Sequence, residues 1–263
     1  MTAPVEYGVC RLSIVTVRKE ADQKGEPVTQ LLFGDHYEVS EISKDQKWLH
    51  IKISSDEITG WIDSLQHHSI SQEYHQQIAL ANFKITTDIA STILYKKTQL
   101  TIVMGSIVPI SGSELFKMEE QFAFNGEAKS IGQRRDFEYL RGVTGKYLNA
   151  PHLYGGKSPF GIDASGFTQM SFRLTGYQLP RDATQQTTAG KAIANLGEAQ
   201  PGDLAFFAGK DGKINHTGIL LDEQKIIHCS GRVRIDYLME EGILAAETKI
   251  YTHRLAGLRR ILG

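Results

Sequence analysis

The sequence is organised around the stretch Tyr154-Gly155-Gly156-Lys157-Ser158-Pro159-Phe160-Gly161-Ile162-Asp163-Ala164-Ser165-Gly166-Phe167. Its glycines and proline disfavour a regular element, whereas the residues from Phe167 to Leu174 repeat at helical spacing and Gly176 supplies a stop signal. We therefore expect a loop that ends at a helix N-terminus near Asp163. Unpaired backbone N–H groups and the helix dipole at such an end lower the pKa of a thiol. The position suits a reactive cysteine, and this chain has Ala164 there.

Two histidines provide a second signal. Alternating residues predict strands over Asn215 to Leu221 and Lys225 to Cys229, with a turn at Asp222 between them. A hairpin centred on that turn places His216 directly opposite His228, with Cβ atoms roughly 4.5–5.5 Å apart. One imidazole can then orient the other through a ring N–H, as base and orienter do in a cysteine peptidase. A single histidine on a strand is more often structural, but the pair favours a site.

No neighbouring side chain is expected to replace the missing thiol. Ser165 is turned by about 100° around the helix from position 164, and its hydroxyl is far less acidic than a thiol. Cys229 follows His228 on a strand, so its side chain should point to the opposite face. We expect neither residue to act as a nucleophile.

Several motifs in a fixed order resemble those of the NlpC-type murein peptidases, over roughly residues 146 to 263. They are Gly155-Gly156, Gly161-Ile162-Asp163-x-Ser165-Gly166-Phe167, Leu179-Pro180-Arg181-Asp182, Gln200-Pro201-Gly202-Asp203-Leu204 and His216-Thr217-Gly218-Ile219. The resemblance implies that Ala164 occupies the position of the nucleophilic cysteine. It also implies that His216 is the general base and His228 the orienting third residue. Where the family usually has a tyrosine, this chain has His152.

The resemblance further implies contacts to substrate. In related peptidases the Asp and Ser beside the nucleophile hold the free N-terminal amine, a role that falls here on Asp163 and Ser165; helix capping is the alternative. Glu26 lies where relatives use a carboxylate of the SH3-like domain toward that amine, although an exposed turn glutamate is the commoner interpretation. Two further candidates come from the residues themselves and not from the resemblance: Trp61 either touches ligand or packs in its barrel, and Arg181 either binds a peptide carboxylate or forms a structural ion pair.

The N-terminal part is strand-rich. Predicted strands cover Arg11 to Val17, Pro27 to Leu32, His36 to Glu41, Trp48 to Ile53 and Gly60 to Ile62. This series resembles a bacterial SH3-like domain of the type found ahead of NlpC-type catalytic domains, and closely spaced strands suggest a small barrel. We assign residues 1–80 to this barrel, residues 81–145 to a second, divergent SH3-like barrel with a helical connector, and residues 146–263 to the catalytic domain.

The second barrel has weaker signals. Gln99 to Val103 and Ile107 to Ile110 flank a turn at Gly105-Ser106, and Leu115 to Met118 with Gln121 to Asn125 suggest another hairpin. The segment Ser130 to Gly145 is predicted to be helical.

The last domain is predicted to be α+β. Asp182 is a candidate N-cap for a helix through Ala192. Strands follow over Asp203 to Phe207, Val233 to Ile235 and Leu255 to Ile261, together with the two histidine-bearing strands. A helix carrying the nucleophile packed on an antiparallel sheet carrying the base is the papain-like arrangement.

Composition excludes other classes of function. The chain has 263 residues, 41% hydrophobic and 22% charged, with a formal net charge of −1, so we expect no nucleic-acid or membrane partner. We also expect a monomer. Two cysteines, and a start without a basic segment followed by an apolar one, predict a cytoplasmic protein, or a periplasmic or envelope protein if a signal peptide has been removed. No metal-ligand spacing or phosphate loop is present in the sequence, so we expect no metal and no cofactor.

Three functional interpretations remain open. The first is a cysteine peptidase that cuts the γ-D-Glu to diamino-acid bond of murein peptides with a free N-terminal L-Ala, inactive as written because alanine has been introduced at position 164. The second is a natural pseudoenzyme that binds such peptides without cutting them. The third is a wall-binding protein that acts through its SH3-like domains.

Overall fold

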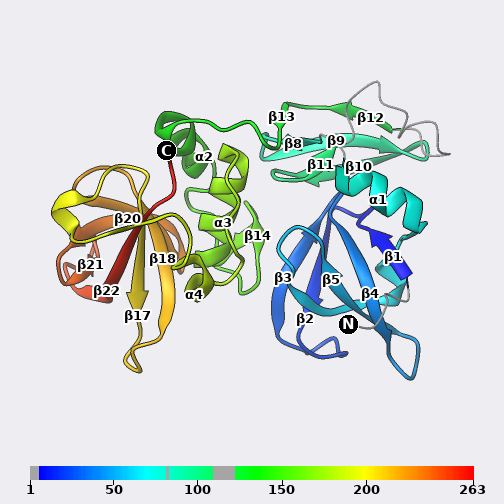
Figure 1. The fold of residues 1–263 in the computed structure, drawn as a ribbon, viewed down its shortest axis with the longest axis horizontal. Coiled ribbons are helices and arrows are strands. Elements are labelled where there is room, and N and C mark those ends of the chain that lie inside the picture. The colour runs from blue at the N-terminus through cyan, green and yellow to red at the C-terminus, as the bar shows by residue number, and fades with distance from the viewer. Residues whose placement is uncertain (1–5, 81–82, 109–121) are drawn as a thin grey trace. The chain divides into compact units, whose positions relative to one another are not determined.

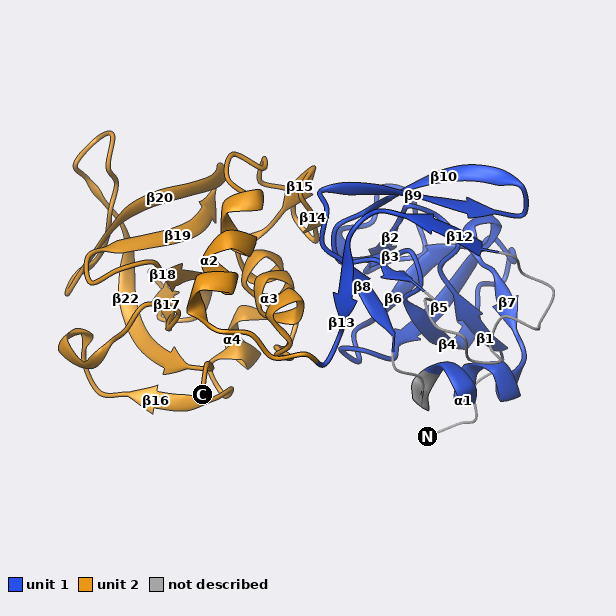
Figure 2. Cartoon of the chain, turned by 90° about the horizontal axis from the view of Figure 1, so that it is seen from above, with its two compact units in different colours: residues 1–132 blue, residues 133–263 orange. Residues whose placement is uncertain are grey.

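The computed structural model describes residues 6–80, 83–108 and 122–263. The chain divides into two compact units, residues 1–132 and 133–263 (Figure 2). Helix α2 (Phe137–Lys146) packs on helix α3 (Ala164–Thr175) and belongs to the second unit. The sequence instead predicts this segment as a connector of the preceding domain, with the boundary after residue 145.

Within its described residues, the first unit contains a seven-stranded antiparallel sheet (Figure 1). The sheet order is β3 (Pro27–Leu32), β2 (Ile14–Arg18), β6 (Thr59–Asp63), β5 (Trp48–Ile53), β4 (His36–Ile42), β1 (Glu6–Val9) and β7 (Ser69–Ile70). Alternate residues of β5 are buried, as strand periodicity requires, and they join an apolar core that includes Val17, Tyr37 and Ile62. Helix α1 (Gln72–Leu80), which is not among the elements predicted from the sequence, follows.

Two three-stranded sheets complete the described part of the first unit. One has the order β10 (Thr98–Val103), β9 (Ala90–Tyr95), β12 (Phe122–Asn125), and the other β11 (Ile107–Val108), β8 (Lys84–Thr86), β13 (Ala128–Ser130). The predicted turn at Gly105-Ser106 therefore joins strands of different sheets, and the hairpin suggested there was wrong. The predicted strand Leu115 to Met118 lies outside the described residues.

The helices of the second unit begin and end at local signals. Asp163 caps α3 by accepting a hydrogen bond from the backbone N–H of Gly166 at 2.7 Å. Gly176 ends the helix at φ 91°, a left-handed conformation, and a Cβ there would lie 2.4 Å from the carbonyl oxygen of Gln133. The predicted boundaries of this helix are thus confirmed. The predicted α2 segment was correct in type but begins later, at Phe137, after an Asp136 cap.

A second seven-stranded antiparallel sheet forms the other layer of this unit (Figure 1). Its order is β16 (Lys191–Ile193), β22 (Tyr251–Arg260), β17 (Leu204–Ala208), β18 (Ile214–Leu220), β19 (Lys225–Ser230), β20 (Arg232–Met239) and β21 (Gly242–Leu244), with β21 also pairing with β22. A short hairpin, β14 (Lys157–Ser158) and β15 (Gly161–Ile162), precedes α3. Helix α3 packs against β18 and β19, so the N-terminus of α3 and the two histidine-bearing strands are brought together.

One helix of this unit is shorter than predicted. Asp182 caps α4, accepting from the backbone N–H groups of Thr184 and Gln185, but α4 covers only Ala183–Gln186. Lys191–Ile193 instead forms β16 and pairs with β22, so the prediction of a helix through Ala192 was wrong. The long-range pairing outweighs the local preference of this segment for helix.

Candidate active site

The N-terminus of α3 is held by two close backbone approaches. A Cβ on Gly166 would lie 2.4 Å from the carbonyl oxygen of Gly156, and a Cβ on Gly156 would lie 2.4 Å from that of Gly161. Only glycine permits this contact between the loop and the first turn of the helix. As a result Ala164 is the first residue of the helix, with 7% of its surface exposed. A thiol at this position would lie beside the helix N-terminus, as the sequence predicted.

The carboxylate of Asp163 is engaged inside the protein. It accepts hydrogen bonds from the backbone N–H of Gly155 at 2.8 Å and of Gly166 at 2.7 Å. Arg181, only 4% exposed, binds the same carboxylate through both terminal nitrogens, at 2.9 and 2.6 Å. One of these nitrogens also donates to the hydroxyl of Ser165 at 2.8 Å.

Three of the predicted substrate contacts, Asp163, Ser165 and Arg181, therefore form hydrogen bonds within the protein. The capping alternative for Asp163 is confirmed, and Arg181 forms the buried ion pair that was the structural alternative to a ligand contact. Asp163 and Ser165 still line the cleft, so their contact with a substrate amine stays a prediction. The side chain of Arg181 does not line that cleft.

The two histidines meet through a register that differs from the predicted one. Gly218, and not His216, lies directly opposite His228. His216 is therefore the diagonal neighbour of His228 on the same face, and its Nε2 lies 2.8 Å from Nδ1 of His228. A Cβ on Gly218 would lie 2.8 Å from the Cβ of His228, so glycine leaves room for His228 beside its neighbour. The predicted opposition was wrong, but the predicted contact between the rings is present.

A buried carboxylate, that of Asp236, extends the hydrogen-bonded pair of His216 and His228 into a chain of three side chains, which we call the relay. Nε2 of His228 lies 3.0 Å from Oδ2 of Asp236, whose side chain is 2% exposed. Asp236 also accepts from Arg234 at 3.0 Å and from the backbone N–H of Ala246 at 2.8 Å. Burial opposes ionisation, but the hydrogen bonds from His228, Ala246 and Arg234 together hold the pKa of Asp236 well below its usual range. Asp236 is therefore an anion at neutral pH.

This chain of hydrogen bonds fixes the tautomers. An ionised Asp236 accepts the Nε2–H of His228, so a neutral His228 presents Nδ1 as an acceptor. His216 then donates its Nε2–H to that nitrogen and keeps a lone pair on its own Nδ1. Burial first, and then the charges of His228, His253 and His152, lower the pKa of His216 well below its ordinary value. His216 is thus a neutral base with one free acceptor nitrogen.

A further histidine, His253 of β22, covers His216. The two rings are stacked with centroids 4.0 Å apart at 24°. Burial, and then the charge of His228, lower the pKa of His253 to about 4, so it too is neutral at neutral pH. Neither Asp236 nor His253 is predicted as a site residue from the sequence. Asp236 carried a usable signal, because it is the one acidic residue of the strand Arg232–Met239 and lies two residues after Arg234.

A cleft of about 420 Å³ opens at these groups. It is lined by His152, Tyr154, Asp163, Ala164, Ser165, Asn215, His216, Cys229, Ser230, Gly231 and His253. His152 is half-buried, its backbone bonded to Gly231, and its ring meets that of Tyr154 edge-on with centroids 4.7 Å apart. The cleft therefore brings together the predicted nucleophile position, the base and the residue that replaces the family tyrosine.

Cys229 lines the cleft but is held as a thiol. Its Sγ lies 3.1 Å from the carbonyl oxygen of Ile162 and donates to it, and 2% of the residue is exposed. Burial, with a contribution from Asp163, raises the pKa of this thiol to about 12. A protonated, buried thiol is a poor nucleophile, which supports the prediction that Cys229 does not replace the missing residue.

The remaining predicted contacts, Glu26 and Trp61, belong to the first unit. Glu26 is exposed and lies 4.0 Å from Nζ of Lys19. Trp61 is half-buried and meets the ring of His50 edge-on, with centroids 5.0 Å apart. Their contact with a ligand stays a prediction. In the described residues, no group of His, Cys, Asp and Glu side chains is arranged to hold a metal ion, and no helix is long and apolar enough to cross a membrane.

The chain is similar to known proteins in both units. The NlpC/P60 family model matches residues 149–253, and the model of the bacterial dipeptidyl-peptidase SH3 domain matches residues 17–66. The gamma-D-glutamyl-L-lysine dipeptidyl-peptidase of Bacillus subtilis (strain 168) is 29% identical over 248 residues, which cover 88% of this chain and 80% of that protein.

Two further matches are shorter or more distant. The bifunctional muramidase/DL-endopeptidase CwlT of Bacillus subtilis (strain 168) is 42% identical over 86 residues, covering 32% of this chain and 26% of that protein. A crystal structure of an NlpC/P60 family protein from Bacillus cereus ATCC 10987 has the same fold, with a TM-score of 0.78 at 20% identity over 98% of this chain and 100% of the other. The chain therefore carries an NlpC/P60 domain in its second unit and a bacterial SH3 domain in its first.

Proposed function

We propose that the cleft of the second unit binds murein peptides of the type L-Ala-γ-D-Glu-diamino acid, and that Ala164 leaves the chain unable to cut them. The observation that carries the proposal is the complete base relay beside a position without a nucleophile. His216, His228 and Asp236 are joined by hydrogen bonds of 2.8 and 3.0 Å, while Ala164 occupies the first turn of α3. The names of the Bacillus subtilis relatives, a γ-D-glutamyl dipeptidyl-peptidase and a DL-endopeptidase, support cell-wall peptidase ancestry and this class of peptide.

The chemistry requires a sulfur atom at position 164. In a cysteine peptidase the thiolate attacks the γ-D-Glu carbonyl, the histidine returns a proton to the leaving amine, and water then cleaves the thioester. Alanine has no lone pair with which to begin. Removal of the nucleophile from a hydrolase of this kind eliminates most of the rate advantage. Binding does not depend on that atom, because the cleft, the helix N-terminus and the polar side chains around them remain.

The test compares the chain with Ala164→Cys. Each is incubated with L-Ala-γ-D-Glu-meso-diaminopimelate at neutral pH under reducing conditions, and release of L-Ala-D-Glu is followed. We expect turnover by the cysteine variant alone, and micromolar binding of the intact tripeptide by the chain as it stands. A matched control, Ala164→Ser, introduces a far less acidic hydroxyl and should remain at least a hundredfold slower than the cysteine variant. If neither form binds the tripeptide, the assignment to murein peptides is wrong.

A natural pseudoenzyme is the second candidate, and His152 is the observation that favours it. This side chain lines the cleft at the position where the family usually has tyrosine, so a second group of the site differs besides Ala164. The pseudoenzyme predicts that Ala164→Cys binds the tripeptide and does not cut it. The double variant Ala164→Cys, His152→Tyr should then recover turnover, whereas turnover by the single variant would contradict this candidate. A free N-terminal L-Ala and a monomeric state are further parts of the proposal, checked with an N-acetylated tripeptide and by sedimentation.

A further inference from the structure

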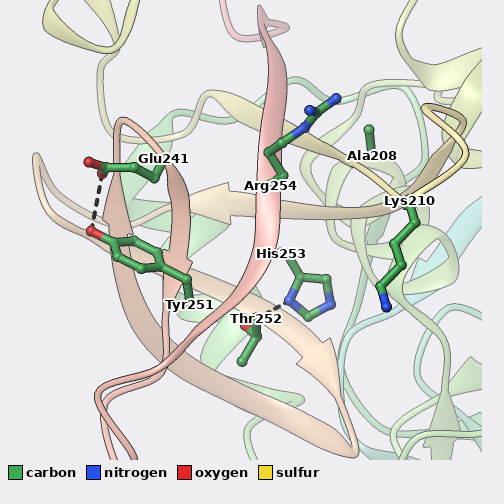
Figure 3. A pocket seen from close by; sticks show the side chains of 8 residues that line it. Ala208, Lys210, Glu241, Tyr251, Thr252, His253 and Arg254 are labelled. Carbon is green, nitrogen blue, oxygen red and sulfur yellow. Dashed lines mark hydrogen bonds between the residues drawn. The ribbon is translucent and has the colours of Figure 1, made fainter.

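A second pocket of the same unit, of about 540 Å³, lies at strand β22 and shares one residue with the cleft (Figure 3). The shared residue is His253, which lines both cavities. The other lining residues are Ala208, Gly209, Lys210, Glu241, Tyr251, Thr252 and Arg254. His253 therefore borders both cavities, and its ring stacks on that of His216 with centroids 4.0 Å apart.

The pocket is lined by two cationic side chains and one carboxylate. Lys210, in the turn between β17 and β18, and Arg254, on β22, are exposed cations. In the part of the chain that the structure describes, neither side chain forms an ion pair. Glu241 is the pocket's carboxylate, and the hydroxyl of Tyr251 donates to it at 3.1 Å. Figure 3 shows the amine of Lys210 facing the His253 ring and the guanidinium of Arg254 pointing away from that ring, with the Glu241–Tyr251 pair across the strand. The cations are thus available to an anion.

The side of the peptide that leaves after cleavage is the part of a ligand that we expect to lie nearest this pocket. A histidine that takes the proton of the nucleophile returns it to the leaving amine, so the leaving side of the peptide must pass close to His216. His253 stacks on His216 and also lines the pocket. For a γ-D-Glu to diamino-acid bond, the leaving amine is that of the diamino acid, which carries its own carboxylate only two bonds away.

We propose that this pocket, which we call the carboxylate pocket, binds a carboxylate on the diamino-acid side of the peptide through Lys210 and Arg254. The inference rests on the proposed function and names the part of the ligand that the pocket recognises. Two sources offer the same chemistry: the α-carboxylate of the diamino acid, and the second carboxylate at the far end of meso-diaminopimelate, which lysine lacks. Charge-assisted hydrogen bonds from Arg and Lys to a carboxylate are strong enough to discriminate between such ligands.

The experiment uses the full chain as it stands, because without a nucleophile it leaves the ligand intact during titration calorimetry. The ligands are L-Ala-γ-D-Glu-L-Lys, its C-terminal amide, and L-Ala-γ-D-Glu-meso-diaminopimelate. The variants are Lys210→Gln and Arg254→Gln. The matched control is Lys213→Gln, an exposed lysine of the same turn that does not line the pocket.

We expect a carboxylate that reaches the pocket to tighten binding about five- to tenfold, and Lys210→Gln or Arg254→Gln to remove that gain. A difference between the acid and the amide that these variants remove identifies the α-carboxylate. A difference between diaminopimelate and lysine that they remove identifies the far carboxylate. Lys213→Gln should change each affinity less than twofold.

Different binding results would exclude the carboxylate pocket and the proposed function. If the chain binds all three ligands equally, or if the variants weaken all three by the same factor, the carboxylate pocket is wrong and peptide binding still stands. If the chain binds none of the ligands, the proposed function has failed, and the pocket assignment fails with it.

Discussion

Removing the charge of the Asp236 carboxylate should lower the free energy of unfolding of the second unit strongly. The carboxylate, 2% exposed, lies 3.0 Å from Nε2 of His228, 2.9 Å from Nε of Arg234 and 2.8 Å from the backbone nitrogen of Ala246. Asp236→Asn keeps the shape but removes the charge and replaces one acceptor oxygen by a donor, which then faces another donor. Breaking a buried ion pair by neutralising one partner costs about 3–5 kcal/mol, and because asparagine retains one acceptor we expect about 3 kcal/mol.

The assay is urea unfolding of the full chain followed by far-UV circular dichroism. Both tryptophans, Trp48 and Trp61, lie in the first unit, so tryptophan fluorescence reports that unit separately. The control is Glu247→Gln, which removes an exposed carboxylate 3.7 Å from the same arginine, Arg234, and should cost less than about 1 kcal/mol. If Asp236→Asn lowers the free energy of unfolding no more than Glu247→Gln does, the Asp236 carboxylate does not hold His228 and Arg234 in place.

Three further predictions concern the same unit. Gly166→Ala should lower the free energy of unfolding by about 1–3 kcal/mol and weaken peptide binding, because its Cβ would lie 2.4 Å from the carbonyl oxygen of Gly156; equal stability in thermal unfolding would contradict this. Arg181→Lys should cost about 1–3 kcal/mol in the same assay, because lysine cannot bind Asp163 through two nitrogens, and an unchanged midpoint would show that the paired contact is dispensable. Folding lowers the pKa of His253 from 6.5 to about 4. As the pH falls from 6.5 to about 4, the unfolded chain therefore takes up a proton on His253 that the folded chain does not, and the folded state loses stability over this range. His253→Phe should therefore make the loss of stability between pH 7 and pH 4 shallower in urea titrations; the same slope in both proteins would refute the assignment.

The helix at the site was predictable because its signals are local. Asp163 precedes the first turn and bonds Gly166 three residues later, and Gly176 takes the left-handed conformation that ends the helix. The spacing of the motifs likewise identified position 164 and both histidines. By contrast, α4 ends at Gln186 because residues farther along pair with β22, a partner remote in sequence.

The arrangement of the histidines likewise depends partly on local signals and partly on partners remote in sequence. Strand alternation predicted that His216 and His228 share a face, but the register depends on the whole sheet, and it places Gly218 opposite His228. The ring contact survives because a shift of two residues preserves the face of the sheet. Asp236 and His253 join the site from β20 and β22, which no local pattern connects to β18.

The sequence by itself therefore predicted that Ala164 lies at a helix start and that His216 and His228 lie on one face of a strand pair. These follow from capping, periodicity and spacing, which act over a few residues. Only the tertiary structure decided what surrounds them: the Asp236 anion that sets the tautomers, the Arg181 contact that occupies Asp163, and His253, which lines two cavities. The physical reason is that the electrostatic environment of a buried group depends on which distant strands fold against it.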